Sequence, residues 1–136
     1  MSEHETLRLQ ALQIVDPQGR PRLVLSAASG APSIRLLHSD GTAQAIVSLD
    51  DTGLPSVTLC NPDPAHPTVR LEVDDKGTHL KLDHPGGSTA YLFVNNGGTC
   101  GLVMVDPQGE RKVDIKAPAS GEAAARTLDE AGKSPA

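Results

Sequence analysis

The chain has 136 residues, of which 38% are hydrophobic and 21% are charged, and its formal net charge is −5. This length predicts one domain, and the negative charge argues against a phosphate-backbone partner, which usually requires a basic stripe. No stretch approaches the ~18 apolar residues of a membrane-spanning helix, so we expect neither nucleic acid nor a membrane as a partner.

The first ten residues, MSEHETLRLQ, are polar and contain no apolar segment of the kind found in signal peptides. We therefore expect a cytoplasmic protein in which Cys60 and Cys100 are reduced thiols and not a disulfide. Residues 1–6 are predicted to be an N-terminal extension, and residues 7–116 are predicted to be a repetitive all-β domain.

Turn signals recur through this domain about every eleven residues. Glycine closes a polar turn at eight positions, and the one double interval contains NPDPAHP (61–67), which is turn-rich without glycine. Nine turns then separate about ten strands. The glycines are Gly19, Gly30, Gly41, Gly53, Gly77, Gly87, Gly98 and Gly109.

Apolar residues at every second position between the turns predict half-buried strands. The segment TVRLEV (68–73) shows the pattern, with three aliphatic residues on the predicted inward face and three polar residues on the outward face. Helical spacing is absent before residue 117. The predicted inward positions are Ala43, Ala45, Val47 and Leu49, then Val69, Leu71 and Val73, then Leu80 and Leu82, and then Val113 and Ile115.

A longer period is also present. SGAPSI (29–34) returns as TGLPSV (52–57), and VDPQG (15–19) returns letter for letter at 105–109. These offsets indicate a unit of 21–24 residues with two strands and two turns, which is typical of a repeat architecture. A type I turn prefers Asp at its first position, Pro at its second and Gly at its fourth. VDPQG therefore predicts a recurring turn and not a catalytic motif.

The last twenty residues (117–136) change character, since Ala, Gly, Ser and Pro dominate there. EAAARTLDEAG (122–132) could form at most a short helix, below the length at which an isolated helix is stable in water. We expect a flexible tail, with a docking segment for a protein partner as the alternative.

The acidic residues of the turns are the first candidates for a binding site, because calcium prefers clustered carboxylate and carbonyl oxygens. The sequence has neither an EF-hand loop nor the glycine–aspartate nonapeptide of calcium β-rolls, and Asp is also a favoured turn residue. We interpret these residues as structural and keep calcium binding as an alternative. They are Asp16, Asp50, Asp51, Asp74, Asp75 and Asp106.

The histidines lack the close spacing of a zinc site. His79 and Asp83 share the predicted outward face with Lys81, as residues of solvated strands commonly do. Cys60 and Cys100 lie in or beside apolar strands, where cysteine usually acts as a small hydrophobic residue, and whether either is functional stays open. The histidines are His4, His38, His66, His79 and His84.

No G-x-S-x-G nucleophile elbow is present. The glycine-rich HPGG (84–87) and NNGG (95–98) do not lead into a helix whose N-terminus would bind a phosphate. We therefore designate no catalytic, cofactor-binding or metal-binding residue, expect no cofactor, and predict that the protein is not an enzyme.

DPQGRPRLVL (16–25) has an Asp-x-x-Gly turn followed by Arg22 and Leu25. This pattern resembles the strand-turn repeats of uncharacterised bacterial proteins. The later segment DPQGERKVDI resembles it less closely, with Lys112 in the place of the arginine. The likeness covers about residues 12–116 and implies repeated β-structure and no activity. The alternation of strand and Gly/Pro turn also resembles viral trimeric β-spiral shafts, whose repeats are generally shorter.

Ten strands permit an up-and-down barrel, a flattened meander, a solenoid or a trimeric shaft. With one Tyr and one Phe, the core must be aliphatic and is thin for a monomer. AYLFV (90–94) and GLVMV (101–105) also carry apolar residues on both faces, which requires a cover on both. We therefore predict an oligomeric all-β meander or solenoid-like fold and a structural or assembly protein that self-associates. The alternatives are a β-barrel that binds a lipophilic small molecule and a calcium-binding β-repeat module.

Overall fold

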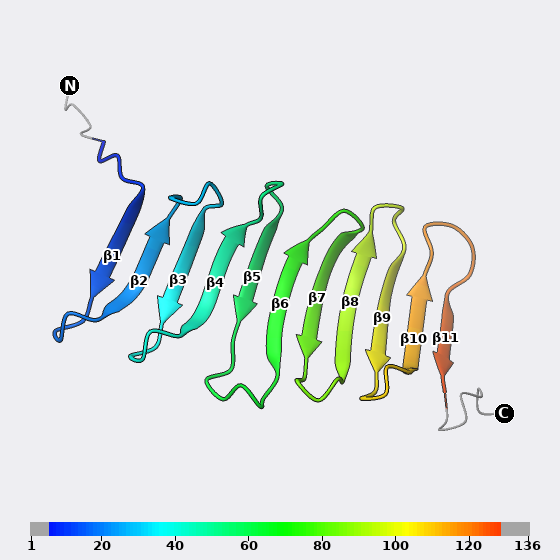
Figure 1. The fold of residues 1–136 in the computed structure, drawn as a ribbon. Helices are drawn as coiled ribbons and strands as arrows, with labels where there is room; N and C mark the ends of the chain where they lie inside the picture. Colours follow the sequence, from blue (N-terminus) through cyan, green and yellow to red (C-terminus); the bar gives the residue numbers. More distant parts are fainter. Residues whose placement is uncertain (1–5, 129–136) are drawn as a thin grey trace.

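A computed structural model of the chain describes residues 6–128, which form eleven β-strands (Figure 1). The strands are β1 (Ala11–Val15), β2 (Pro21–Ser26), β3 (Ser33–Leu37), β4 (Ala43–Leu49), β5 (Pro55–Leu59), β6 (Thr68–Val73), β7 (Gly77–Asp83), β8 (Thr89–Asn95), β9 (Cys100–Val105), β10 (Arg111–Ala117) and β11 (Ala124–Thr127).

All eleven strands belong to one open sheet, in which each strand pairs antiparallel with its neighbours along the chain. Figure 1 shows a single layer with β1 and β11 at opposite ends. The prediction of an all-β fold is confirmed, and the arrangement is a meander. It is neither a closed barrel nor a stack of coils, because β1 and β11 lie at opposite edges. No helix within residues 6–128 has the length and apolarity that a membrane crossing requires.

Five-residue turns join many of the neighbouring strands. In the first DPQG segment, the Gly19 N–H donates to the Asp16 carbonyl (2.8 Å) and the Asp16 N–H donates to the Arg20 carbonyl (2.9 Å). The Asp16 carboxylate accepts hydrogen bonds from the N–H groups of Gln18 and Arg20, both at 3.0 Å. Gly19 has a φ of 77°, which glycine adopts without a steric cost. The structure is a type I turn followed by a glycine bulge.

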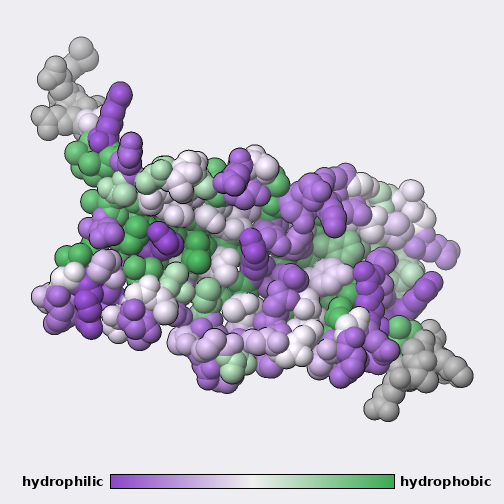
Figure 2. Space-filling view, viewed as in Figure 1, coloured by the Kyte–Doolittle hydropathy of each residue, from purple (hydrophilic) through white to green (hydrophobic). Residues whose placement is uncertain are grey.

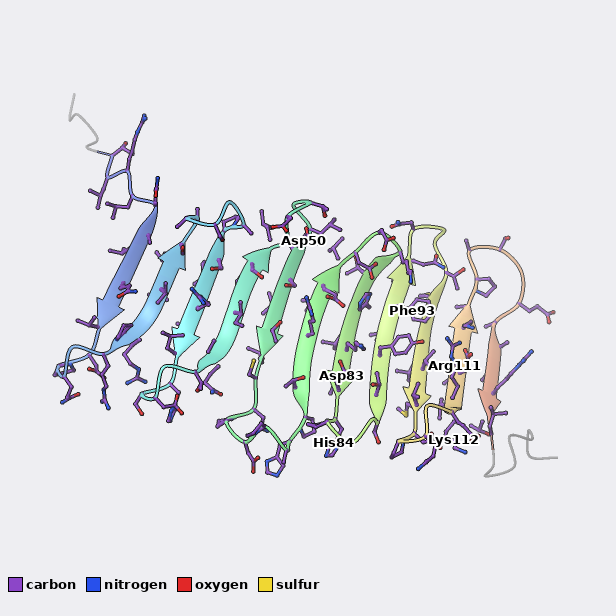
Figure 3. The ribbon with its side chains drawn as sticks, viewed as in Figure 1. Asp50, Asp83, His84, Phe93, Arg111 and Lys112 are labelled. Carbon is purple, nitrogen blue, oxygen red and sulfur yellow. The ribbon has the colours of Figure 1, made fainter. Side chains whose placement is uncertain are left out.

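The second DPQG segment repeats these contacts. The Gly109 N–H donates to the Asp106 carbonyl (3.0 Å), and the Asp106 carboxylate accepts from the N–H groups of Gln108 (3.0 Å) and Glu110 (2.9 Å). The turns lie at both ends of the strands, as the labelled residues Asp50 and His84 show (Figure 3). The same backbone pattern begins at His38, Asp50, His84 and Asn95.

The pairing register aligns alternate residues into rows across the whole sheet. On one side, which we call the apolar face, two such rows cross all eleven strands. The first row is Leu12, Leu25, Ile34, Val47, Val57, Leu71, Leu80, Leu92, Leu102, Ile115 and Ala125. The second row is Ile14, Leu23, Leu36, Ala45, Leu59, Val69, Leu82, Ala90, Met104, Val113 and Thr127.

The other side, which we call the mixed face, combines polar and apolar residues. Figure 2 shows hydrophobic residues gathered over β1–β4 and hydrophilic residues over much of β6–β10. One row of this face is Ser26, Ser33, Ser48, Ser56, Glu72, His79, Phe93, Gly101 and Lys116.

The residues predicted to point inward do share one face of the sheet, but they are more exposed than predicted. Leu71 and Ile115 are 48% and 42% exposed, although both are on the predicted buried side. The side chains of Glu72 and His79, which belong to the opposite face, are only 21% and 19% exposed. The reason is that a single sheet places no second layer over its apolar face, whereas long polar side chains on the mixed face cover one another.

The C-terminal segment also differs from expectation. Ala124–Thr127, which the sequence places in a flexible tail or a short helix, form β11 and pair with β10. Residues 6–128 therefore form eleven strands instead of about ten. The backbone edge of β10 provides partners to a segment that has little pattern of its own, and the Leu128 N–H donates to the Lys112 carbonyl (2.9 Å). Residues 1–5 and 129–136 lie outside the described part of the chain.

Candidate functional site: the apolar face of the sheet

The apolar face is continuous and uncharged. Each strand contributes one residue to each row because side chains alternate with a period of two and the hairpins keep the register. Ten inter-strand spacings of ~4.8 Å give a strip about 48 Å long. Neither row contains Asp, Glu, Lys or Arg, and threonine is the one polar residue, at the β11 edge.

Most large side chains of this face are half exposed. Their exposed fractions lie between 37% for Leu49 and 55% for Leu92. An exposed Leu is ordinary in a soluble protein, but a contiguous exposed apolar patch marks an interaction surface. The exposed residues of this face are Leu12, Ile14, Ile34, Leu36, Val47, Leu49, Leu59, Leu71, Val73, Leu82, Leu92, Val94, Met104 and Ile115.

The total accessible surface is large for the mass of the chain. It is 9756 Å², whereas a compact monomer of 14.2 kDa has about 6,800 Å². The terminal residues outside the described range could contribute at most about 2,000 Å² of this difference even if fully extended. The remaining excess follows from the single-layer sheet, which exposes both of its faces.

Covering the apolar face would release a substantial free energy. Complete burial of one large aliphatic side chain contributes about 1.5–3 kcal/mol. The fourteen side chains above are about half exposed, so covering them would contribute about 10–20 kcal/mol per protomer. Association costs about 4–15 kcal/mol in lost rigid-body freedom. The apolar face can therefore drive association by itself.

The buried apolar residues lie on the opposite side of the sheet. Among the described residues, the buried hydrophobic side chains are Val24, which is 6% exposed, and Val103, which is 0% exposed. Both belong to the mixed face, where Val24 pairs with Gln13 and Val103 pairs with Tyr91. Around these two residues the mixed face is covered by its own side chains, whereas none of the residues in the two apolar rows is buried.

The two aromatic rings of the chain cover the backbone of the mixed face. Tyr91 and Phe93 lie side by side with a ring-centroid distance of 5.9 Å. A Cβ atom on Gly101 would come within 2.7 Å of the Phe93 ring, so this ring lies directly over the glycine. Phe93 and Gly101 are paired in register, and an aromatic ring placed in this way protects the strand where glycine has no side chain.

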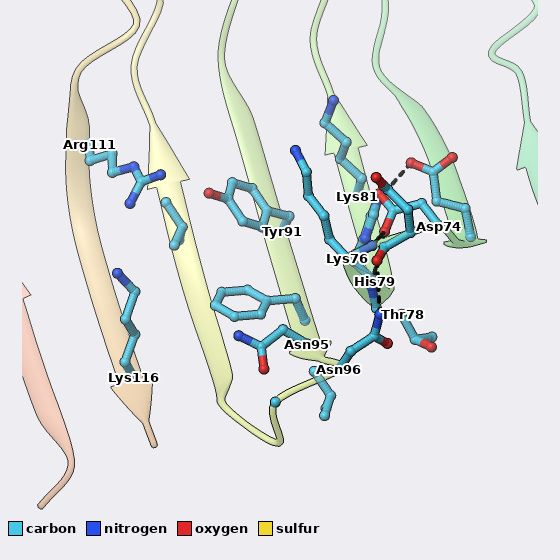
Figure 4. A pocket seen from close by; sticks show the side chains of 17 residues that line it. Asp74, Lys76, Thr78, His79, Lys81, Tyr91, Asn95, Asn96, Arg111 and Lys116 are labelled. Carbon is cyan, nitrogen blue, oxygen red and sulfur yellow. Dashed lines mark hydrogen bonds and ion pairs between the residues drawn. The ribbon is translucent and has the colours of Figure 1, made fainter. Parts of the chain in front are cut away.

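A hollow of about 820 Å³ lies over these rings, between the charged side chains of β7 and β10 (Figure 4). Its charges are largely paired. His79 Nε2 lies 2.7 Å from Glu72 Oε1, and Arg111 and Lys116 reach Asp114 at 3.3 and 3.2 Å. Glu72 and His79 are register partners on β6 and β7. These pairs have a structural explanation as cross-strand and same-strand contacts of a solvated face.

The predicted acidic residues do not converge on one site. The carboxylates of Asp16, Asp50, Asp74 and Asp106 each accept hydrogen bonds from N–H groups of their own turns. Asp51 and Asp75 are exposed beside two of them. Within residues 6–128, no group of three or more His, Cys, Asp or Glu side chains is placed to hold a metal ion. The calcium alternative therefore has no ligand group in the described residues.

The histidines and cysteines are also dispersed. His38 and His84 begin turns, and the His84 Nδ1 accepts a hydrogen bond from the Gly86 N–H (2.9 Å). His79 pairs with Glu72, and the predicted neighbours Lys81 and Asp83 pair with each other at 3.3 Å. His66 lies 3.7 Å from Asp63 in the loop before β6, and His4 lies outside the described residues. Both cysteines are free thiols, with Cys60 half-buried and Cys100 exposed.

The turn carboxylates predict a loss of stability in acid. A hydrogen bond from the Leu54 N–H lowers the pKa of Asp50, and a hydrogen bond from the Glu110 N–H lowers the pKa of Asp106. Hydrogen bonds from Thr42 lower the pKa of Asp40 to about 2. A lowered folded-state pKa stabilises the fold above the unfolded value of about 3.9, and this contribution is lost as the pH falls toward the folded value.

We therefore expect the melting temperature to fall as the pH drops below about 4, as Asp50 and Asp106 become protonated and as the pH approaches the pKa of about 2 of Asp40. Thermal denaturation across pH 2–7 measures this effect. The double variant Asp50→Asn/Asp106→Asn keeps the oxygen acceptors but removes the charges, so its melting temperature should depend less steeply on pH. Equal slopes for the variant and the wild type would contradict this assignment.

Only part of the apolar face is predicted by the sequence. The predicted inward positions lie in four segments and do not include Ile34, Leu36 or Leu59, which are members of the two rows. A signal was available, because these residues also alternate with polar neighbours. Their alignment with distant strands required the register of the intervening hairpins.

Comparison of the chain with protein-family models, with curated proteins and with solved structures finds no match. The resemblance to bacterial strand-turn repeats therefore stays a prediction.

Proposed function

We propose that the protein is a non-enzymatic structural or assembly protein whose sheet self-associates, with the apolar faces of two copies packed against each other. The observation that carries this proposal is the pair of uncharged, half-exposed rows that cross all eleven strands. An isolated sheet with one apolar face normally buries that face against a second layer.

The dimensions of the face favour a second copy over a small molecule. A drug-sized ligand occupies a pocket of roughly 300–1,000 Å³. The hollow of about 590 Å³ beside Leu9 and Leu49 is of this size, but its lining extends only from β1 to β5. The whole strip is about 48 Å long, and a second sheet can cover all of it. At about 25 cal/mol per Å², the burial of 10–20 kcal/mol corresponds to about 400–800 Å² per protomer. Specific protein interfaces bury about 800 Å² per partner, so the upper part of this range suits a stable dimer.

The composition of the face also supports self-association. Large aromatic residues and charges would create pockets or local mismatches, and the two rows contain neither. Aliphatic side chains repeated at nearly constant spacing can interdigitate with an identical surface, as the inner faces of a β-sandwich do at a separation of about 10 Å. A two-fold axis then makes every contact twice.

Size-exclusion chromatography with light scattering tests the proposal. The expected result is a mass of at least two chains at micromolar concentration, without binding of a dye that reports exposed apolar surface. A monomer that binds such a dye would overturn the proposal. A monomer that co-purifies with a lipophilic molecule in native mass spectrometry would overturn it in favour of ligand binding in the hollow of about 590 Å³ beside Leu9 and Leu49.

A further inference from the structure

The two edges of the sheet are unequal. The β1 strand, ALQIV, contains neither a charge nor a proline, and all of its residues are exposed. The β11 strand has only four residues and includes Arg126. Sheets protect their edges with short strands, charges, prolines and bulges. The irregularity of β1 lies at its end, between Ile14 and Val15, and leaves the preceding residues regular. The β1 edge is therefore the less protected one.

The unpaired backbone groups of β1 follow from its pairing with β2. The Ala27 N–H donates to the Gln10 carbonyl (2.9 Å), which makes these residues a hydrogen-bonded pair. Hydrogen-bonded and non-bonded pairs alternate along an antiparallel ladder. Alternate residues of β1 therefore bond to β2, and the others, Ala11, Gln13 and Val15, direct their N–H and C=O groups away from the sheet.

Topology restricts how a second copy can use this edge. Because an antiparallel meander of eleven strands has its first and last strands in the same direction, translation of a copy along the sheet would place β11 parallel to β1. Rotation about a two-fold axis perpendicular to the sheet places β1 beside β1 instead. This pair is antiparallel, and both apolar faces remain on the same side. Antiparallel pairs are the more stable kind.

We propose that a second copy of this chain pairs its β1 with β1 across a two-fold axis at Gln13. In this register Gln13 faces its own equivalent, and Ala11 faces Val15 of the other copy. These are the residues whose backbone groups point outward, so their N–H and C=O groups can bond reciprocally. On the apolar face, Leu12 of one copy lies opposite Ile14 of the other.

The edge pairing extends the surface that the proposed function uses. The first row of one copy continues into the second row of the other, because Leu12 belongs to the first row and Ile14, which lies opposite it, belongs to the second. The apolar face then spans two sheets without interruption. The pairing of β1 with β1 occupies this edge in both copies. The assembly through this edge therefore closes after two copies and does not grow into a fibre.

A proline at position 13 tests the edge without breaking the sheet. The Gln13 N–H points outward, so proline removes no bond between β1 and β2, and proline is tolerated at edge positions of this kind. We expect Gln13→Pro to halve the mass measured by light scattering. The matched control is Ala125→Pro, because the Leu128 N–H donates to the Lys112 carbonyl and Ala125 therefore directs its N–H outward from β11. The control should keep the wild-type mass.

A cysteine at the same position gives a positive signal. Directly opposed Cα atoms of a hydrogen-bonded pair are ~5.5 Å apart, which is within the disulfide range. In a Cys60→Ser/Cys100→Ser background, Gln13→Cys should form a covalent dimer on mild oxidation, and Ala125→Cys should not. An unchanged mass for Gln13→Pro together with an absent Gln13→Cys dimer would overturn the proposal, and would leave the edge to a strand of another protein.

The proposed pairing through the β1 edge and the proposed pairing through the apolar face can be contradicted independently. If only the edge pairs, the wild type is a dimer and Gln13→Pro is a monomer. If both surfaces pair, the wild type is larger and Gln13→Pro retains the dimer that is joined through the apolar face. The ratio of the two masses tests the edge, whereas a substitution within the apolar rows tests the proposed function.

Discussion

Replacement of Leu71 with lysine is expected to dissociate the proposed dimer, in which two apolar faces pack together, while leaving each protomer folded. Leu71 lies in β6, the central strand, and is 48% exposed in the single chain, so a lysine there remains solvated in the protomer. In the dimer its ammonium group would be buried far from the rim. A loss of about 2 kcal/mol for each copy raises the dissociation constant by roughly 1,000-fold.

The measurement is the concentration dependence of the mass, with far-UV circular dichroism as the test of folding. Ser56→Lys is the matched control, because Ser56 belongs to the neighbouring strand β5 but to the mixed face, opposite Glu72 in the pairing register. A lysine there gains a carboxylate neighbour and should leave the mass unchanged. If both variants kept the wild-type mass, the apolar face would not be the interface.

Gly77→Ala is expected to cause the largest loss of folding stability among the turn substitutions. Gly77 is buried at the start of β7 and has a φ of 150°. A Cβ atom there would collide with the Val94 carbonyl oxygen and lie 2.6 Å from the Asn95 Cα. These are backbone atoms of β8 and cannot move aside as a flexible side chain would. Strain and overpacking together predict a loss of about 2–5 kcal/mol.

Urea denaturation measures this loss. The protein concentration is kept fixed, since the proposed self-association would contribute to the apparent stability. Gly19→Ala is the control, because Gly19 has a φ of 77° but nothing within 4 Å of the added Cβ. It should lose only about 1 kcal/mol, which is the cost of a left-handed conformation for alanine. Equal losses for the two variants would show that conformation, and not the contact with β8, decides the requirement for Gly77.

The turns and strand positions could be predicted because their causes are local. The Asp16 carboxylate binds the backbone of its own turn, and the same contacts recur at Asp106, ninety residues later in the chain. Val69, Leu71 and Val73 were assigned to one face by alternation alone, and they lie on one face. Neither feature needs information from a distant part of the chain.

β11 could not be predicted in the same way. AART has no alternation of large apolar and polar residues, and alanine favours helices over strands. Its conformation depends on β10, in which Asp114 pairs with Arg126 of β11 and Val113 pairs with Thr127. The aromatic pair was likewise unassigned, because the cover that Phe93 provides for Gly101 requires the register between β8 and β9.

Before residue 117, the turns, the extended segments between them and the apolar side of several strands could be predicted from the residues alone. The open, single-layered arrangement of the sheet could not, and it leaves Leu71 and Leu92 half exposed while Val103 is buried. Alternation is a property of a few neighbouring residues, whereas burial depends on what lies above the sheet. Among the described residues, nothing forms a second layer over the apolar face.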